Sequence, residues 1–194
     1  MKSIVSFSIL LFSALTALSQ GNSGDYYYEI PNAPDDYTAG AVAARMVDGL
    51  GFRYYWGTEG LRSEDLLFRA NDSARSVIET IDHIHGLTQV LVNAVNQRPH
   101  SAVDLAGLSY SEKRNMTLAN IRQASDILRA ASPDDLEKYD MIFSSERKYP
   151  FWNLINGPIA DAIHHNGQII TMRRMSGNPI HPKISVLQGK VYDH

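Results

Sequence analysis

The sequence predicts an all-α protein built around one bundle of four helices. Helical spacing of apolar residues recurs in four long segments from Thr38 onward, and the alternating apolar and polar runs of half-buried strands are missing. The composition is that of an ordinary globular protein, because 44% of the 194 residues are apolar and 20% are charged. Four helices of this length form a four-helix bundle of normal size.

Residues 1–19 are typical of a secretory signal peptide. Lys2 supplies a positive charge, residues 4–18 are almost wholly apolar, and Ala17 and Ser19 are the small residues that a signal peptidase reads. The apolar run of about 15 residues is shorter than the roughly 20 that span a bilayer, which argues against a retained membrane anchor. We therefore expect cleavage after Ser19 and an exported protein, periplasmic or secreted, with no stable membrane insertion after cleavage.

The next segment is a leader followed by the first helix. Residues 20–37 contain two prolines and no helical period, so we expect them to lie across the fold as an N-terminal leader. The first helix is predicted over about residues 38–59, with Gly60 as its stop. Its apolar stripe is predicted to consist of Val42, Met46, Leu50 and Tyr54.

The two middle helices have clear limits in the sequence. The second is predicted over about residues 76–97, and its wide apolar arc places it inside the bundle. Pro99 follows its end and cannot continue the helix. The third is predicted over about residues 109–131, because Ser109 and Glu112 match a capping box.

The fourth helix and the tail complete the domain. The helix is predicted over about residues 151–175, with Pro158 interrupting or starting it and Gly177 closing it. Residues 180–191 are expected to form a strap over the bundle. Residues 38–194 are therefore predicted to be one domain, a bundle with a C-terminal strap.

Charge and cysteine content exclude several classes of function. The net charge is −3, so the chain has no basic field to hold a phosphate backbone, and nucleic acid is not an expected partner. The absence of cysteine excludes disulfides, thiolate zinc sites and cysteine nucleophiles. Any metal ion must be held by His, Asp or Glu.

Asp161 and His165 lie one turn apart in the middle of the expected apolar face of the fourth helix. This spacing lets both side chains ligate one metal ion, with a further ligand from a facing helix. The donors on the second helix are His83 and His85, which lie on opposite edges of its apolar arc, so the helical wheel does not choose between them. His164 projects about 100° away from His165 and is expected to lie outside the site. A buried Asp161–His165 hydrogen bond without metal is the alternative, since a buried carboxylate needs a partner.

The residues before and around His83 resemble the DinB/YfiT-like family. Residues 63–70 match its short acidic segment that ends in Arg, and residues 75–84 match its pattern "S-[IV]-x-E-x-x-x-H-[IL]". His83 occupies the position of that family's first metal ligand. The resemblance thereby selects His83 over His85.

A second signature of the same family is similar to residues 165–169. Its pattern is "H-H-x-G-Q-[ILV]", in which the second His is a ligand, and this position corresponds to His165. The family has another His four residues earlier, where this chain has Asp161. The resemblance implies an antiparallel four-helix bundle of DinB/YfiT-like topology, with one divalent ion near one end. His83, Asp161 and His165 are the implied ligands.

The donor set indicates the class of metal. Two His and one Asp suit zinc or nickel, and the same set is a facial triad that can hold iron. Glu79, one turn before His83, is either an orienting partner or a plain surface neighbour. Gln168 is expected at the edge of the site. Arg173 and Arg174 fit the preference for cations at a helix C-terminus and need no ligand.

Two functions from different classes follow from these patterns. The first is an exported metal-dependent hydrolase or transferase that acts on a small molecule. The second is a non-catalytic binding or stress-associated module, whose metal or Asp–His pair is structural; the substituted ligand and the missing general base favour it. The substrate is not indicated by the sequence, and a homodimer is compatible with it.

Overall fold

The structure is a computed structural model and describes residues 26–192. The predicted signal peptide and residues 20–25 of the leader lie outside these described residues, so cleavage after Ser19 stays a prediction. Between residues 26 and 192, none of the helices has both the length and the apolar character that crossing a bilayer requires.

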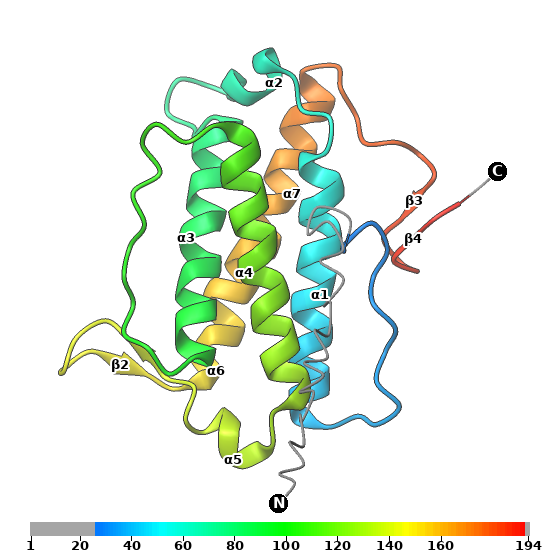
Figure 1. The fold of residues 1–194 in the computed structure, drawn as a ribbon. Helices are drawn as coiled ribbons and strands as arrows, with labels where there is room; N and C mark the ends of the chain where they lie inside the picture. The colour runs from blue at the N-terminus through cyan, green and yellow to red at the C-terminus, as the bar shows by residue number, and fades with distance from the viewer. Residues whose placement is uncertain (1–25, 193–194) are drawn as a thin grey trace, which may run out of the picture.

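Four long helices form the bundle and confirm the predicted all-α class (Figure 1). They are α1 (Ala39–Thr58), α3 (Val77–Val95), α4 (Tyr110–Ala130) and α7 (Ala160–Met175). Helix α1 packs antiparallel to α4, and α3 packs antiparallel to α7. The long connection over residues 96–109 returns the chain to its starting end, so α3 and α4 run parallel to each other (Figure 1). The bundle therefore contains both antiparallel and parallel neighbours.

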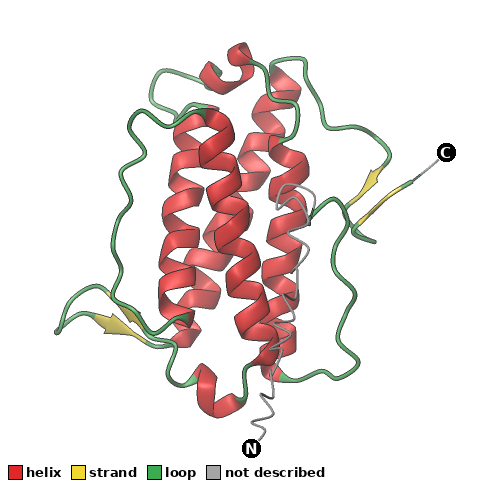
Figure 2. Ribbon diagram, viewed as in Figure 1, coloured by secondary structure: helices red, strands yellow, loops and turns green. Residues whose placement is uncertain are grey.

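Short elements cover the two ends and one side of the bundle (Figure 2). Two hairpins have strands of only two residues, and the second of them accepts a hydrogen bond from the segment before α1, from Ile30 N–H to Gly189 O at 2.8 Å. The strap over the bundle stays a prediction. The short elements are α2 (Ser63–Leu67), α5 (Pro133–Leu136), β1 (Met141–Ile142), β2 (Lys148–Tyr149), α6 (Phe151–Leu154), η1 (Ile155–Ile159), β3 (Ile184–Ser185) and β4 (Lys190–Val191).

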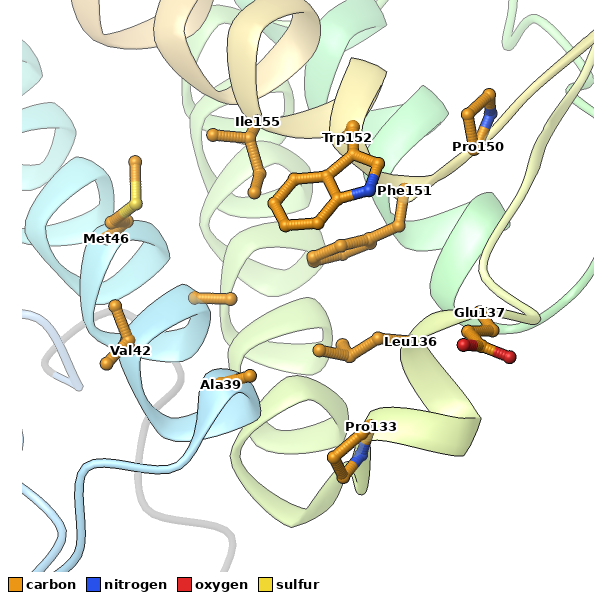
Figure 3. A pocket seen from close by; sticks show the side chains of 11 residues that line it. Ala39, Val42, Met46, Pro133, Leu136, Glu137, Pro150, Phe151, Trp152 and Ile155 are labelled. Carbon is orange, nitrogen blue, oxygen red and sulfur yellow. The ribbon is translucent and has the colours of Figure 1, made fainter.

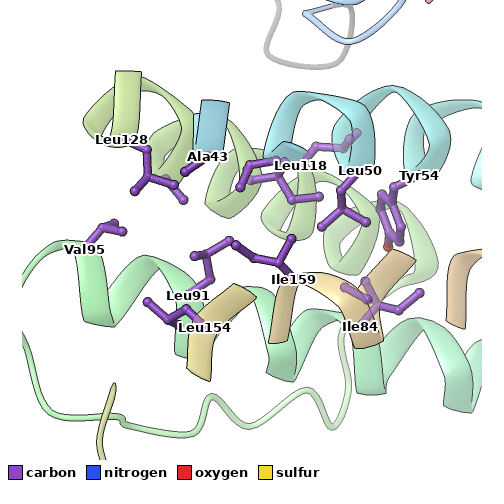
Figure 4. Packing of buried hydrophobic residues seen from close by; sticks show 14 of the residues in the cluster. Ala43, Leu50, Tyr54, Ile84, Leu91, Val95, Leu118, Leu128, Leu154 and Ile159 are labelled. Carbon is purple, nitrogen blue, oxygen red and sulfur yellow. The ribbon is translucent and has the colours of Figure 1, made fainter. Parts of the chain in front are cut away.

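The predicted apolar stripe of α1 is half wrong. Leu50 and Tyr54 are fully buried, but Val42 is 47% exposed and Met46 is 37% exposed. At the N-terminal end of α1, small residues form the face that packs on α4 instead. The two backbones lie so close there that a Cβ on Gly40 would be 2.4 Å from the carbonyl oxygen of residue 131. The prediction failed because it considered only large apolar residues. It therefore overlooked the face on which small residues let the two backbones approach closely. Branched aliphatic residues and Tyr54 fill the space between the helices (Figure 4).

The predicted fourth helix is divided by a wide turn. Helix α6 and helix α7 are joined by η1, a π-type turn in which Gly157 leaves the helical region of backbone conformation (φ −97°, ψ −106°). The spacing of the buried residues shows that the turn contains one extra residue. The buried Ile159 lies five residues after the buried Leu154, whereas a regular helix would place the next buried residue after three or four. The extra residue rotates everything beyond it by about 100° relative to a continuous helix.

This rotation corrects the predicted burial of Asp161. In a continuous helix Asp161 would lie in the middle of the apolar face, but 42% of its side chain is exposed in the structure. The buried residues of α7 are Ala162, Asn166, Ile169, Met172 and Arg173. Asp161 therefore lies at the edge of the α3–α7 contact.

Arg173 is also corrected, because it is a buried residue and not a solvated helix end. It is only 4% exposed, and its Nη1 donates to the carbonyl oxygens of Trp56, Gly57 and Glu59 at 2.9, 3.1 and 3.0 Å. The last carbonyls of a helix have no partner within it. Arg173 supplies partners for those at the end of α1, whereas Arg174 is exposed as expected.

A buried carboxylate ties α2 to the end of α7. Asp65 is fully buried and accepts hydrogen bonds from Arg62 Nη2 at 2.7 Å, Ser176 Oγ at 2.6 Å and Asn178 Nδ2 at 2.6 Å. The Arg62 guanidinium, helped by Ser176 and Asn178, holds the pKa of Asp65 well below its usual range in spite of burial, which raises it. The connection holds α2 against the residues that follow α7.

Asp65→Asn is expected to lower the free energy of unfolding by about 2 kcal/mol at neutral pH, because hydrogen bonds to a charged group are lost. The folded pKa is lower than the unfolded value near 3.9, so this stability is fully present above that pH, begins to decline as pH falls below it, and is lost completely only at the folded pKa. Urea unfolding of both proteins between about pH 7 and pH 3 measures the difference. Asp36→Asn, at an exposed position, is the control. A difference that does not shrink in acid would contradict this role.

Candidate metal centre

The structure brings together the three residues that the sequence predicted as ligands. His83 lies in the second turn of α3, and Asp161 and His165 lie in the first two turns of α7. One ligand atom from each lies within 4.8 Å of the other two. His83 Nε2 is 3.3 Å from Asp161 Oδ2, and His165 Nε2 is 3.4 Å from Asp161 Oδ1. The three side chains converge on one point between α3 and α7.

The neighbouring histidines lie elsewhere. His85 is buried on the α4 side of α3, where its Nδ1 lies 3.1 Å from Thr117 Oγ1. His164 is exposed and is not part of the three-residue group. The geometry therefore agrees with the choice of His83 over His85 and with the exclusion of His164.

Gln168 holds His165 in the orientation that a metal ligand needs. Its Oε1 lies 2.8 Å from His165 Nδ1, so a proton on Nδ1 is donated to the amide oxygen. The lone pair then lies on Nε2, the atom that faces Asp161. Metal-ligating histidines are usually held by such a hydrogen bond on the other ring nitrogen. The donor atoms and their support therefore fit a divalent metal ion.

The local electrostatics favour the ligating form of His83. Its pKa is lowered, first by burial and then by the positive charge of Arg75, although the hydrogen bond with Asp161 acts in the opposite direction. Only the neutral imidazole ligates a metal ion. His83 therefore keeps its ligating form to a lower pH than an ordinary histidine does.

Glu79 does not orient His83. Its Oε2 accepts hydrogen bonds from the backbone N–H of Ser76 at 2.7 Å and from Ser76 Oγ at 2.9 Å, and it pairs with Arg69 at 3.3 Å. Glu79 thus closes the capping box that begins α3. The sequence pattern "S-x-x-E" over residues 76–79 carries this signal.

A cavity of about 930 Å³ adjoins the cluster, and His165 is part of its wall. Its lining comes from α7 and from the loop before α3, and it includes Gln168, Met172 and Arg75. Arg75 was not among the predicted site residues, because only the fold shows that residues 70–75 and α7 share one cavity. The cluster therefore lies next to space that a small molecule can occupy.

A second cavity, of about 570 Å³, lies at the opposite end of the bundle between α1, α5 and α6 (Figure 3). Its wall is apolar and includes Val42, Met46 and the exposed Trp152. Glu137 is the only carboxylate among the described residues that line it, and no histidine joins it there. This cavity lacks the donor set of a metal centre.

Comparison with known proteins supports the fold. No protein-family model matches the chain, and no curated protein matches it. Its structure is similar to the crystal structure, at 2.30 Å resolution, of a DinB-like protein from Bacillus subtilis, with a TM-score of 0.50 and 16% sequence identity. The match covers 71% of this chain and 95% of the other. The protein therefore has a DinB-like four-helix fold with a His/Asp cluster that can hold a metal ion.

Proposed function

We propose that this protein is an exported DinB-like protein that binds one divalent metal ion through His83, Asp161 and His165, and that it acts as a hydrolase or transferase on a small molecule. The observation that carries the proposal is the convergence of three donor atoms within 4.8 Å, with Gln168 fixing His165. Export rests on the signal-peptide pattern of residues 1–19.

The donor set favours zinc or nickel and also suits iron. A bound ion of this kind supplies positive charge that polarises a substrate oxygen or activates water. The chain itself supplies the orientation of His165 through Gln168, a lowered pKa at His83 caused first by burial, and an adjoining cavity. About 930 Å³ lies within the size range of small-molecule sites, so the cavity supports a small substrate and not a macromolecule.

A non-catalytic module is the second candidate. The observation that favours it is the engagement of Glu79 in the capping box, which removes the glutamate nearest in sequence to His83 as a general base. In that case the metal ion would only stabilise the bundle. A homodimer is compatible with either function.

Metal removal is the experiment that tests the proposal. Protein purified without a His tag and reloaded with zinc is expected to melt several degrees lower in EDTA at about pH 7.5, because an ion that binds only the folded chain stabilises it by roughly 4 kcal/mol at a thousandfold excess over Kd. The difference is expected to shrink at about pH 6, where protons compete for the histidines. Metal analysis of the same samples is expected to give one ion per chain. Identical melting curves with and without EDTA at the higher pH would show that the Asp–His cluster is a bare hydrogen-bonded group.

A further inference from the structure

Arg75 places a permanent positive charge in the wall of the cavity that adjoins the metal centre. Among the described residues that line this cavity it is the only Lys or Arg, and no Asp or Glu accompanies it there. Helix α7 contributes His164, His165 and Gln168 to the lining, and Met172 and Met175 provide apolar surface. The cavity thus combines one permanent cation, hydrogen-bonding side chains and an apolar wall.

The guanidinium of Arg75 has no ion-pair partner in the part of the chain that the structure describes. Arg75 also lines an adjoining depression that contains Asp72 and Glu79, but neither carboxylate forms an ion pair with it. Glu79 is already engaged by Ser76 and by Arg69. An unpaired arginine in a concave site is available to an anionic ligand, whereas Arg69 is not.

The loop that carries Arg75 is fixed by hydrogen bonds. The backbone N–H of Val77 donates to Phe68 O at 3.0 Å, and that of Ala74 donates to Asn71 O at 3.1 Å. Arg75 therefore shares one cavity with His165 and is held on an ordered loop.

We propose that the substrate of this site is an anionic small molecule, whose carboxylate or phosphate group is bound by Arg75 while its apolar part lies against Met172 and Met175. The planar guanidinium matches both oxyanions by paired hydrogen bonds. The reactive part of the ligand reaches the His83–Asp161–His165 cluster, and this step alone rests on the proposed metal function.

Direct binding of probe anions tests the proposal. Benzoate and phenyl phosphate are titrated into metal-free and zinc-loaded protein, with the neutral benzamide for comparison, and binding is followed by NMR chemical shifts. Arg75→Gln is expected to weaken binding of the preferred anion by about tenfold or more in both forms, because a charge-assisted hydrogen bond is lost. Arg69→Gln removes the same charge from a paired arginine and is expected to change binding by less than about twofold. Melting curves establish that both variants fold.

The outcomes separate this proposal from the metal function. Arg75-dependent anion binding by a protein that holds no zinc would support the anion site and overturn the metal proposal. Zinc binding with equal anion affinity in wild type and Arg75→Gln would leave the metal proposal intact and overturn the anion site. Benzamide binding as tightly as benzoate and phenyl phosphate would also overturn it. The relative affinities of the two anions identify which oxyanion the site prefers.

Discussion

His165→Ala is expected to abolish metal binding, with a loss of affinity of roughly 100-fold or more, because even residues that only support metal ligands contribute 10- to 100-fold. His165 forms the i, i+4 pair with Asp161, and its ring is held in a fixed orientation. Its Nδ1 lies against Gln168 and its Nε2 faces Asp161. Isothermal titration with zinc and metal analysis of the purified variant measure the loss.

His164→Ala is the matched control for this experiment. It removes an exposed imidazole from the adjacent position of the same helix, outside the three-residue group. Zinc affinity is expected to stay unchanged. Retention of metal by His165→Ala together with its loss in His164→Ala would mean that the wrong face of α7 has been assigned to the site.

Arg173→Met is expected to lower the free energy of unfolding by about 3 to 5 kcal/mol, the cost of breaking a buried charged network. Methionine preserves much of the apolar stem but leaves the carbonyl oxygens of Trp56, Gly57 and Glu59 without the donor that they share. Burial lowers the pKa of Arg173, but a guanidinium stays protonated in proteins, so the bonds persist across the accessible pH range. Urea unfolding at neutral pH measures the change.

Arg174→Met provides the comparison for this prediction. The neighbouring arginine is exposed at the same helix end, so its replacement is expected to change stability by less than about 0.5 kcal/mol. Equal losses in the two variants would show that the charge at the end of α7 matters and that the hydrogen bonds to α1 do not.

Local patterns were sufficient to predict the elements of the fold. Apolar periodicity indicated α1, α3 and α4 to within a few residues and the end of α7, but not the division of the fourth predicted helix by η1. The capping box at Ser109 and Glu112 marks the observed start of α4. The i, i+4 spacing of Asp161 and His165, with the family resemblance at His83, indicated the three residues that converge. These signals lie within single helices, where sequence distance determines spatial distance.

The exposure of Asp161 depends on the local turn η1, whereas the other misassigned features depend on contacts between distant segments. The burial of Arg173 arises from α1, more than a hundred positions earlier in the chain, and its sequence neighbourhood resembles any basic helix end. Arg75 enters the candidate site only because its loop meets α7. The exposure of Val42 and Met46 follows from close packing of α1 on α4, which a wheel weighted by side-chain size does not detect.

The wide turn η1 has a consequence for how such a site can arise and be lost. The chain before it is anchored by Phe151 and Leu154, so the winding of the turn determines the direction in which Asp161 points. If the same residues were wound as a continuous α-helix, the aspartate would enter the apolar interior, where an ionised carboxylate is costly. A substitution that lets residues 155–159 wind as a regular α-helix thus acts as an evolutionary switch between an accessible ligand pair and a core position. Two chains that share both histidine motifs can therefore differ in metal binding solely through the conformation of this turn.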